Sequence, residues 1–149
     1  MSSSYVRTEI KGFLAANSAE TVIDLTGQFL TMKEVIANAG IGRNDDWVGI
    51  QFIGSNEDPQ TLTSTNTTGC YREFGSVFLH VVARVSQATP DDILTRAETL
   101  RNLIRGRRIN DIVIEGVTPP NFEQGATLDL DAGYSSGSFI VNYYRDLNL

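Results

Sequence analysis

Residues 89–117 read TPDDILTRAETLRNLIRGRRINDIVIEGV and predict a capped amphipathic helix, a glycine stop, a basic turn and a strand. Thr89 offers the side-chain oxygen of an N-cap, Pro90 suits the first helical position, and Asp92 completes a capping box. Gly106 suits a left-handed stop behind the helix. The apolar residues between them recur at the spacing of one helical face: Ile93, Leu94, Ala97, Leu100, Leu103 and Ile104.

Alternating apolar side chains predict strands on both sides of this helix. In WVGIQFI, residues 47–53, Val48, Ile50 and Phe52 point to one face, which indicates a buried side. The longest candidate has a mixed second face, which we expect to be half covered by a neighbouring subunit. The last two candidates are expected to pair as a hairpin through residues 127–131 and 138–145. The strands are expected over residues 21–25, 47–53, 70–86, 109–117, 126–131 and 138–146.

Two further helices complete the predicted elements. Residues 5–16 carry Val6, Ile10, Phe13 and Leu14 on one helical face, and residues 30–39 form a shorter second candidate. The chain has 149 residues, the usual length of one domain. We therefore expect a single α+β domain with a mainly antiparallel twisted sheet, covered on one face by the N-terminal helix and the Thr89 helix.

Residues 54–69 form the longest polar stretch, GSNEDPQTLTSTNTTG. Compact domains seldom keep so long a connection without a use for it. We expect a long polar loop, either mobile or built as an extended hairpin arm, that projects toward an axial partner. The residues expected to contact that partner are Asn56, Glu57, Asp58 and Leu62.

Composition excludes several classes of protein. The formal net charge of −6 argues against a dedicated nucleic-acid binder, because such proteins gain affinity by neutralising phosphates. The one cysteine, Cys70, cannot form an internal disulfide. The N-terminus lacks an apolar signal core and no run approaches ~18 apolar residues, so we expect a protein made in the cytosol with no membrane contact.

The sequence contains no recognisable catalytic or metal-binding motif. His80 is the only histidine and lies in the middle of a predicted strand, so a structural role is favoured over general-base work. The spacing of Asp129 and Asp131 matches the first two ligand positions of a calcium-binding loop. The rest of the motif is absent, because Tyr134 stands at the glycine position and Ile140 at the bidentate-glutamate position. No phosphate-binding loop or cysteine–histidine metal spacing is present. We expect no enzyme, no cofactor and no metal.

The strongest charge feature is a cluster of arginines at the end of the Thr89 helix. One interpretation is ordinary complementarity to the negative end of a helix. A second is a subunit contact, and a third, disfavoured by the acidic net charge, is contact with DNA phosphates. Trp47 is equally open to two roles, as a core residue or an interface anchor. The interface candidates are Arg101, Arg105, Arg107, Arg108 and Trp47.

The segment FLHVVARVSQATPDDILTRAETLRNLIRGRRINDIVIEGV, followed by GSFIVNYYRDL, resembles the tail terminator proteins of long-tailed bacteriophages. In that family a strand is followed by a helix with small and aliphatic positions, a Gly-Arg-Arg-like turn and further strands. The N-terminal helix and the DWVGIQFI strand fit the same plan. The matching positions here are Ala97, Leu100, Ile104, Gly106, Arg107 and Arg108.

The resemblance implies a structural virion subunit that is assembled in the host cytoplasm as a hexameric ring. Such a ring caps the tail tube, ends its polymerisation and joins it to the head connector, while DNA passes through the lumen without specific binding. A closed ring uses a heterologous interface, in which two different patches of each subunit meet. We expect the turn at residues 105–108 to lie at or near one of these patches.

Three other functions remain open. A different head–tail joining or neck protein would share the setting but act on the portal side. A small cytosolic enzyme or ligand-binding domain would need a deep pocket with converging polar groups. A capsid decoration protein is the third.

Overall fold

The computed structural model describes residues 4–26, 46–59, 70–84, 89–122 and 134–148. The helix expected at residues 30–39 and the strand expected at residues 126–131 lie outside this part. The elements in chain order are α1 (Ser4–Asn17), β1 (Val22–Asp24), β2 (Trp47–Pro59), β3 (Cys70–Arg84), α3 (Pro90–Ile104), β4 (Arg108–Ile109), β5 (Ile112–Val117), β6 (Asn121–Phe122) and β7 (Tyr134–Asn148).

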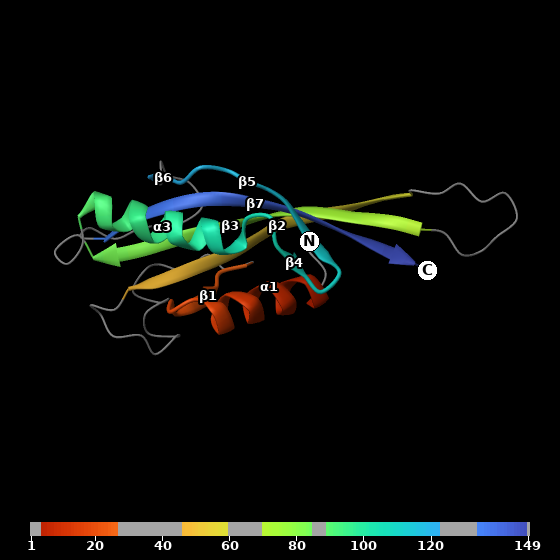
Figure 1. Ribbon diagram of the computed structural model, residues 1–149, viewed down its shortest axis with the longest axis horizontal. Coiled ribbons are helices and arrows are strands. Elements are labelled where there is room, and N and C mark those ends of the chain that lie inside the picture. Colours follow the sequence, from red (N-terminus) through yellow and green to blue (C-terminus); the bar gives the residue numbers. More distant parts are fainter. Residues whose placement is uncertain (1–3, 27–45, 60–69, 85–88, 123–133, 149) are drawn as a thin grey trace, which may run out of the picture.

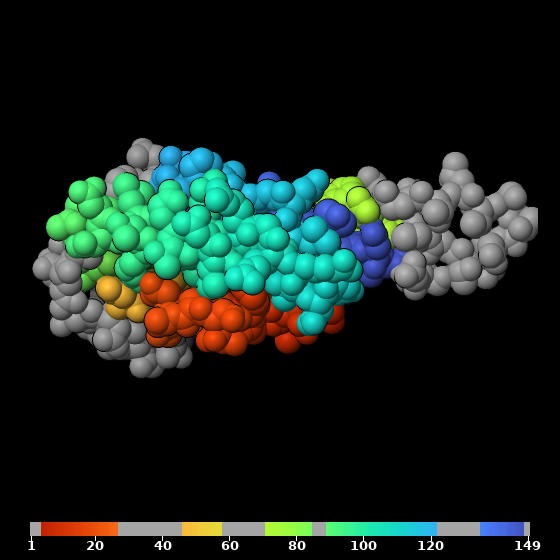
Figure 2. Space-filling view, viewed as in Figure 1, coloured from red at the N-terminus to blue at the C-terminus, as the bar shows by residue number. Residues whose placement is uncertain are grey.

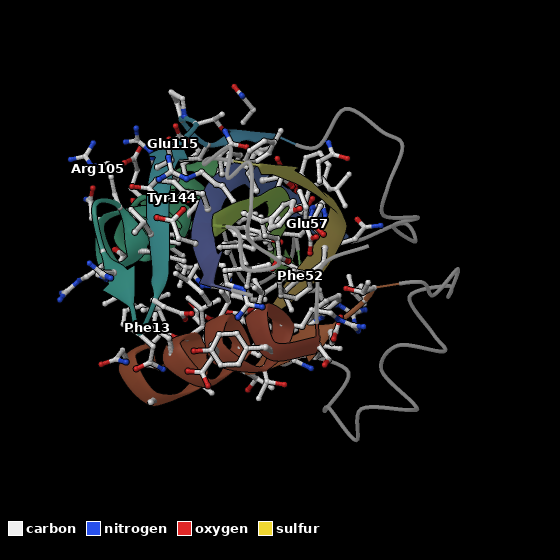
Figure 3. The ribbon with its side chains drawn as sticks, turned by 90° about the vertical axis from the view of Figure 1, so that its right-hand side faces the viewer. Phe13, Phe52, Glu57, Arg105, Glu115 and Tyr144 are labelled. Atoms are coloured by element: carbon white, nitrogen blue, oxygen red, sulfur yellow. The ribbon has the colours of Figure 1, made fainter. Side chains whose placement is uncertain are left out.

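The described strands form one sheet of seven strands in the order β1-β2-β3-β7-β5-β4, with β6 paired to β7. Among these pairs only β1–β2 is parallel. The helices α1 and α3 lie on the same side of the sheet (Figure 1), and the sheet curls around them when viewed from its end (Figure 3). The expectation of an α+β fold with a mainly antiparallel twisted sheet is confirmed.

The α3 helix begins and ends as its sequence predicts. Thr89 Oγ1 accepts a hydrogen bond from the Asp92 N–H at 3.2 Å, and the Asp92 carboxylate accepts one from the Thr89 N–H at 2.9 Å. Gly106 adopts a φ of 70°, the left-handed conformation that glycine takes without strain. The buried face consists of Ile93, Ala97, Leu100 and Ile104.

One hydrophobic core joins both helices to the sheet. α1 contributes Val6, Ile10 and Leu14, which are fully buried. Each such aliphatic side chain contributes roughly 1.5–3 kcal/mol when removed from water. The strands contribute alternate residues, as the period of two requires. These are Val48, Ile50, Phe52, Val77, Leu79, Val81, Ile109, Ile112, Ile114, Phe139, Val141 and Tyr143.

The strand expected over residues 109–117 is confirmed as β5 over residues 112–117, but its start is wrong, because the chain reverses just before Ile112. β4 and β5 form a tight hairpin in which Ile109 pairs with Ile112. Asn110 takes a φ of 55°, a conformation that asparagine tolerates better than most residues. The Asn110–Asp111 pair was therefore the sequence signal for this turn, although the isoleucines around it suggested one continuous strand.

The hairpin expected between residues 127–131 and 138–145 involves a segment that lies outside the described residues. Within the described part, β7 pairs with β3 along residues 134–148 on one edge. Its other edge pairs with β6 at residues 137–138 and with β5 at residues 141–145.

The polar stretch at residues 54–69 is not all loop. β2 continues to Pro59 and pairs with β3 from Cys70 onward, so residues 54–59 belong to a strand. This part agrees with the extended hairpin arm rather than with a loop. Leu62 and the rest of residues 60–69 lie outside the described residues.

Candidate interaction surface

Three long strands continue past the helices and form an arm (Figure 1). We define the arm as residues 54–59 of β2, 70–75 of β3 and 144–148 of β7. These strands pair in continuous antiparallel register over their whole length, apart from a bulge between Phe52 and Gly54. In addition to this backbone pairing, cross-strand ion pairs join β3 and β7 within the arm.

On one face of the arm, Arg145 binds a buried carboxylate. The Arg145 Nε lies 2.8 Å from Glu73, whose side chain is 2% exposed. The guanidinium also lies over the ring of Tyr5, 4.5 Å from the ring centroid. Tyr5 in turn donates a 2.7 Å hydrogen bond to Asp111, which raises the pKa of the phenol. This network fastens the start of α1 to the root of the arm.

On the opposite face, Arg72 makes a bidentate pair with Asp146. Its Nε and one terminal nitrogen lie 2.8 and 3.1 Å from the two carboxylate oxygens. The same guanidinium stacks 4.1 Å from the centroid of the Tyr144 ring. The hydrogen bonds from Arg72 lower the pKa of Asp146. Both faces of the arm therefore carry a cross-strand ion pair.

The two ion pairs lie at directly opposite positions of β3 and β7. Arg72 is in register with Asp146, and Glu73 is in register with Arg145. An Arg-Glu dipeptide thus meets an Arg-Asp dipeptide running the other way, so that opposite charges face each other at both positions. This complementarity was visible in the sequence and would have indicated the β3–β7 pairing.

The outer strand of the arm carries an acid, Glu57, that forms no such ion pair with any other described residue. Glu57 is exposed and lies opposite Glu73, which is already paired with Arg145. β1 pairs with β2 only as far as Ile50, so in the described part of the chain no strand lies beside residues 54–59 on their outer side. Asn56 is exposed at the same edge, and Asp58 stands in register with Arg72.

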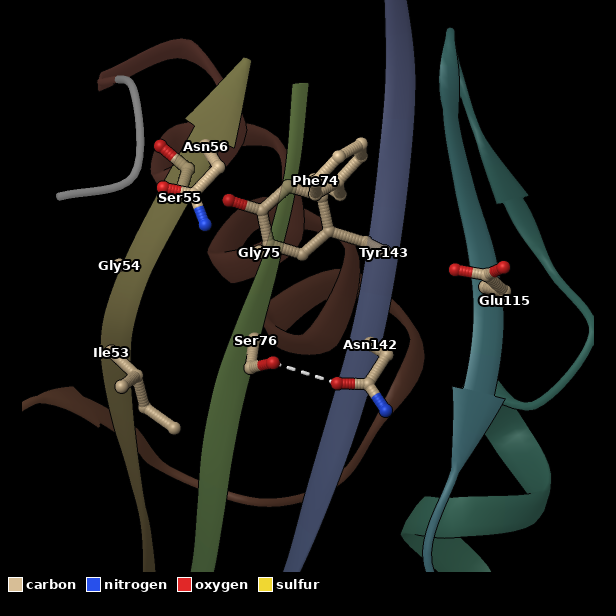
Figure 4. Close-up of a pocket in the computed structure, with 10 residues that line it drawn as sticks. All are labelled: Ile53, Gly54, Ser55, Asn56, Phe74, Gly75, Ser76, Glu115, Asn142 and Tyr143. Atoms are coloured by element: carbon tan, nitrogen blue, oxygen red, sulfur yellow. Dashed lines mark hydrogen bonds between the residues drawn. The ribbon is translucent and has the colours of Figure 1, made fainter. Parts of the chain in front are cut away.

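A shallow groove of about 490 Å³ lies where the arm meets the body (Figure 4). The bulge in β2 leaves Ile53 53% exposed beside it. Across its floor Ser76 Oγ donates a 2.7 Å hydrogen bond to Asn142 Oδ1. Residues of four strands line the groove, among them Asn56, Phe74, Ser76, Glu115 and Asn142.

A second hollow of about 470 Å³ lies between the end of α1 and α3. The helices lie side by side on this face (Figure 2). Arg96 and Glu20 form an ion pair of 2.6 Å at its wall, and Leu100 and Leu103 supply apolar surface. Burial lowers the pKa of Arg96, but the Glu20 carboxylate outweighs it and the pKa is raised.

The arginine candidates have two different placements. Arg101 is 17% exposed and donates to the carbonyls of Val117 and Thr118, so it joins α3 to the end of β5. The other three form the exposed turn at residues 105–108, which we call the arginine turn. Arg107 Nε donates to the Leu103 carbonyl and Arg108 Nε to the Asn110 carbonyl.

The remaining interface candidate is not on the surface. Trp47 is fully buried within the single chain, so the core alternative applies to it. Its indole N–H has no acceptor among the described residues. The arginine turn lies next to β4, at the opposite edge of the sheet from β2, the outer strand of the arm. Arg105 and Glu57 are far apart in the view of Figure 3.

His80 lies in a buried polar cluster on the sheet face opposite the helices. Its Nδ1 is 2.7 Å from Ser138 Oγ and its Nε2 is 3.4 Å from Gln51 Oε1, while its ring stacks on Phe78. A nucleophile must be reachable by its substrate. His80 is 0% and Ser138 8% exposed, and neither residue lines the two hollows. The geometry therefore favours a structural role.

No protein-family model and no curated protein matches this sequence. Within the described ranges, no three His, Cys, Asp or Glu side chains come together as a possible metal site. None of the helices in that part of the chain has the length and apolar character needed to cross a membrane.

Proposed function

We propose that this chain is a ring-forming structural subunit of a long-tailed bacteriophage, of the tail terminator kind that its sequence resembles. The observation that carries the proposal is the arm, three strands that continue past the helices, whose outer strand β2 has an acidic edge with no strand beside it within the described residues. Open edges invite pairing unless something covers them, so such an edge is typical of a subunit completed by its neighbours.

In this function the ring caps the tail tube, ends its polymerisation and joins it to the head connector. The partners are further copies of the chain, the tail tube protein and the connector. The net charge of −6 supports a lumen through which DNA slides, because a basic lining would hold the phosphates.

The first test is assembly. Purified protein is expected to sediment as a ring of about six copies and to show a central hole by negative-stain electron microscopy. Added to polymerising tail tube protein, it is expected to shorten the tubes in proportion to its concentration. A chain that stays monomeric at high concentration and leaves tube length unchanged would contradict the proposal.

A second test concerns residues 60–69 at the end of the arm. Replacing residues 60–70 with a two-residue Asn-Gly turn keeps Pro59 opposite Tyr71, as in the β2–β3 register, and is expected to leave ring formation intact. Binding to tail tube or connector protein, measured by interferometry, is expected to fall at least about tenfold if a contact there contributes about 1.4 kcal/mol. Unchanged binding to both proteins would remove this part of the proposal.

The same purified proteins distinguish two alternative functions from the tail terminator function. Binding to a portal adaptor rather than to tail tube protein indicates a different neck protein. The groove beside Ile53, with polar groups from Ser76, Glu115 and Asn142, favours a ligand-binding domain as the second candidate. That function predicts a monomer whose melting temperature rises with a small polar ligand.

A further inference from the structure

We propose that the two opposite edges of the sheet meet between neighbouring copies of this chain. The acidic outer edge of the arm, residues 54–59 of β2, contacts the arginine turn, residues 105–108, of the next copy. This inference rests on the proposed ring and names the contact that closes it.

The acidic side of the contact follows from two rows of residues that cross the arm. In one row Glu57, Glu73 and Arg145 stand in register, and Arg145 binds Glu73 at 2.8 Å. In the other row Asp58 stands in register with Arg72, which is bound to Asp146 at 2.8 Å. Each row holds one more acid than base, and the outermost acid lies on β2.

The like charges of Glu57 and Glu73 stand directly opposite each other on adjacent strands. Such a pair destabilises a sheet when nothing compensates it. Arg145 compensates Glu73, while Glu57 is exposed and lies on the outermost strand of the arm. A cation supplied from outside the chain would remove this cost, so the edge is suited to a basic partner.

The basic side lies at the other end of the strand order, next to β4. Arg105, Arg107 and Arg108 are exposed, and within the described residues none of them has a carboxylate within salt-bridge distance. Arg107 and Arg108 donate from Nε to the Leu103 and Asn110 carbonyls, and their terminal nitrogens are suited to a bidentate contact with a carboxylate.

The acids nearest this turn are already engaged. Asp111 accepts the Tyr5 hydroxyl and lies 3.8 Å from Arg145. Glu9 accepts a hydrogen bond from the Asn110 side chain. Asp146, whose pKa Arg108 also helps to lower, is bound to Arg72. The exposed arginines of the turn are therefore not neutralised by acids of their own chain within the described residues, and the acids at the outer edge of the arm have the opposite charge.

The positions of the two surfaces decide the symmetry. Figure 3 shows Glu57 and Arg105 toward opposite edges of the curled sheet. A twofold dimer through either surface would put like charges together, acid on acid or arginine on arginine. A head-to-tail contact instead joins unlike surfaces and repeats from copy to copy, which is the interface that closes into a ring.

The test is a charge swap between two variants of the full chain. One carries Glu57→Lys with Asp58→Lys, and the other carries Arg107→Glu with Arg108→Glu. Each variant alone places like charges at every contact, so the concentration at which half of the protein is assembled is expected to rise about tenfold or more. An equal mixture is expected to assemble again, because alternating copies restore opposite charges at every contact.

Assembly is measured by sedimentation velocity and light scattering, and circular dichroism checks that each variant is folded. Glu98→Lys makes one of the same acid-to-lysine changes on the exposed face of α3 and is the control, expected to assemble like the unmodified chain. If the unmodified chain forms rings and both variants do too, the inference is overturned and the proposed function stands. Single variants that fail and a mixture that also fails likewise overturn it, whereas a monomeric unmodified chain overturns both.

Discussion

A single carboxylate, Asp24, joins the first helix to the first strand. Its oxygens accept hydrogen bonds from Arg7 and Lys11 of α1, each at 3.0 Å, and from the Thr26 backbone N–H at 2.9 Å. Burial alone would raise the pKa of Asp24, but the hydrogen bonds from Thr26, Lys11 and Arg7 outweigh it and hold the pKa at about 2. The charged form is therefore the one that the fold stabilises.

Replacing Asp24 tests how much its charge contributes to the stability of the fold. Asp24→Asn keeps an acceptor for Thr26 but removes the charge, so the free energy of unfolding at pH 7 is expected to fall by about 1–2 kcal/mol. Because the folded pKa lies below the unfolded value near 3.8, this contribution is present above about pH 4 and is lost as the pH falls toward 2. Urea unfolding at several pH values measures it, with Glu98→Gln as control. A difference that persists unchanged at pH 2 would contradict the assignment.

At the scale of elements, the arm depends on a close approach between strands at Gly75. A side-chain carbon there would lie 2.5 Å from the Gly54 carbonyl oxygen and 2.6 Å from the Tyr143 hydroxyl. Tyr143 is fully buried, and the Gly54 oxygen belongs to the backbone of a paired strand, which cannot turn aside as a flexible side chain can. The backbone of β3 can pass over this phenol only because residue 75 lacks a side chain.

Gly75→Ala is therefore expected to destabilise the chain by about 2 kcal/mol or more, through overpacking against backbone and a buried ring. Gly12→Ala is the matched control, because nothing lies within 4 Å of its new carbon on α1. That change is expected to raise stability by up to about 1 kcal/mol. Thermal unfolding compares the two, and an equal effect of both changes would refute the steric argument.

Patterns among neighbouring residues predicted the helices and most strands, but they did not predict which strands pair with each other. The capping box at Thr89, the buried stripe of α3 and the alternation in β2 were each readable from a few neighbouring residues. The hairpin at Asn110 and the central place of β7 were not, because a strand's neighbours depend on residues far along the chain. The arm was missed in part because the apolar alternation used to find strands is absent there.

The candidate site was predicted less well than the fold. The arginine turn was identified from its charge, and Glu57 from its place in a long polar stretch. Arg101 and Trp47 proved to serve the chain's own packing, which their residue types alone do not reveal. The ion pairs of Arg72 and Arg145 became meaningful only once β3 and β7 stood in register.

At the scale of the whole molecule, the proposed contact between copies of this chain joins opposite charges, so we expect self-association to be sensitive to salt. Exposed charge pairs are screened as the Debye length shortens from about 10 Å at 0.1 M to about 3 Å at 1 M salt. The rate of self-association, followed by stopped-flow light scattering, is expected to fall severalfold over this range. A rate that rises with salt would indicate that apolar contacts drive assembly instead.

The strand order has a further consequence for synthesis of the protein. β7 is the last described strand in the chain, yet it stands between β3 and β5 and is their only connection within the described sheet. Until β7 has left the ribosome, the nascent chain holds two separate groups of strands with unpaired inner edges. Folding that waits for such a distant pairing is slow, and the waiting edges can join those of other nascent chains.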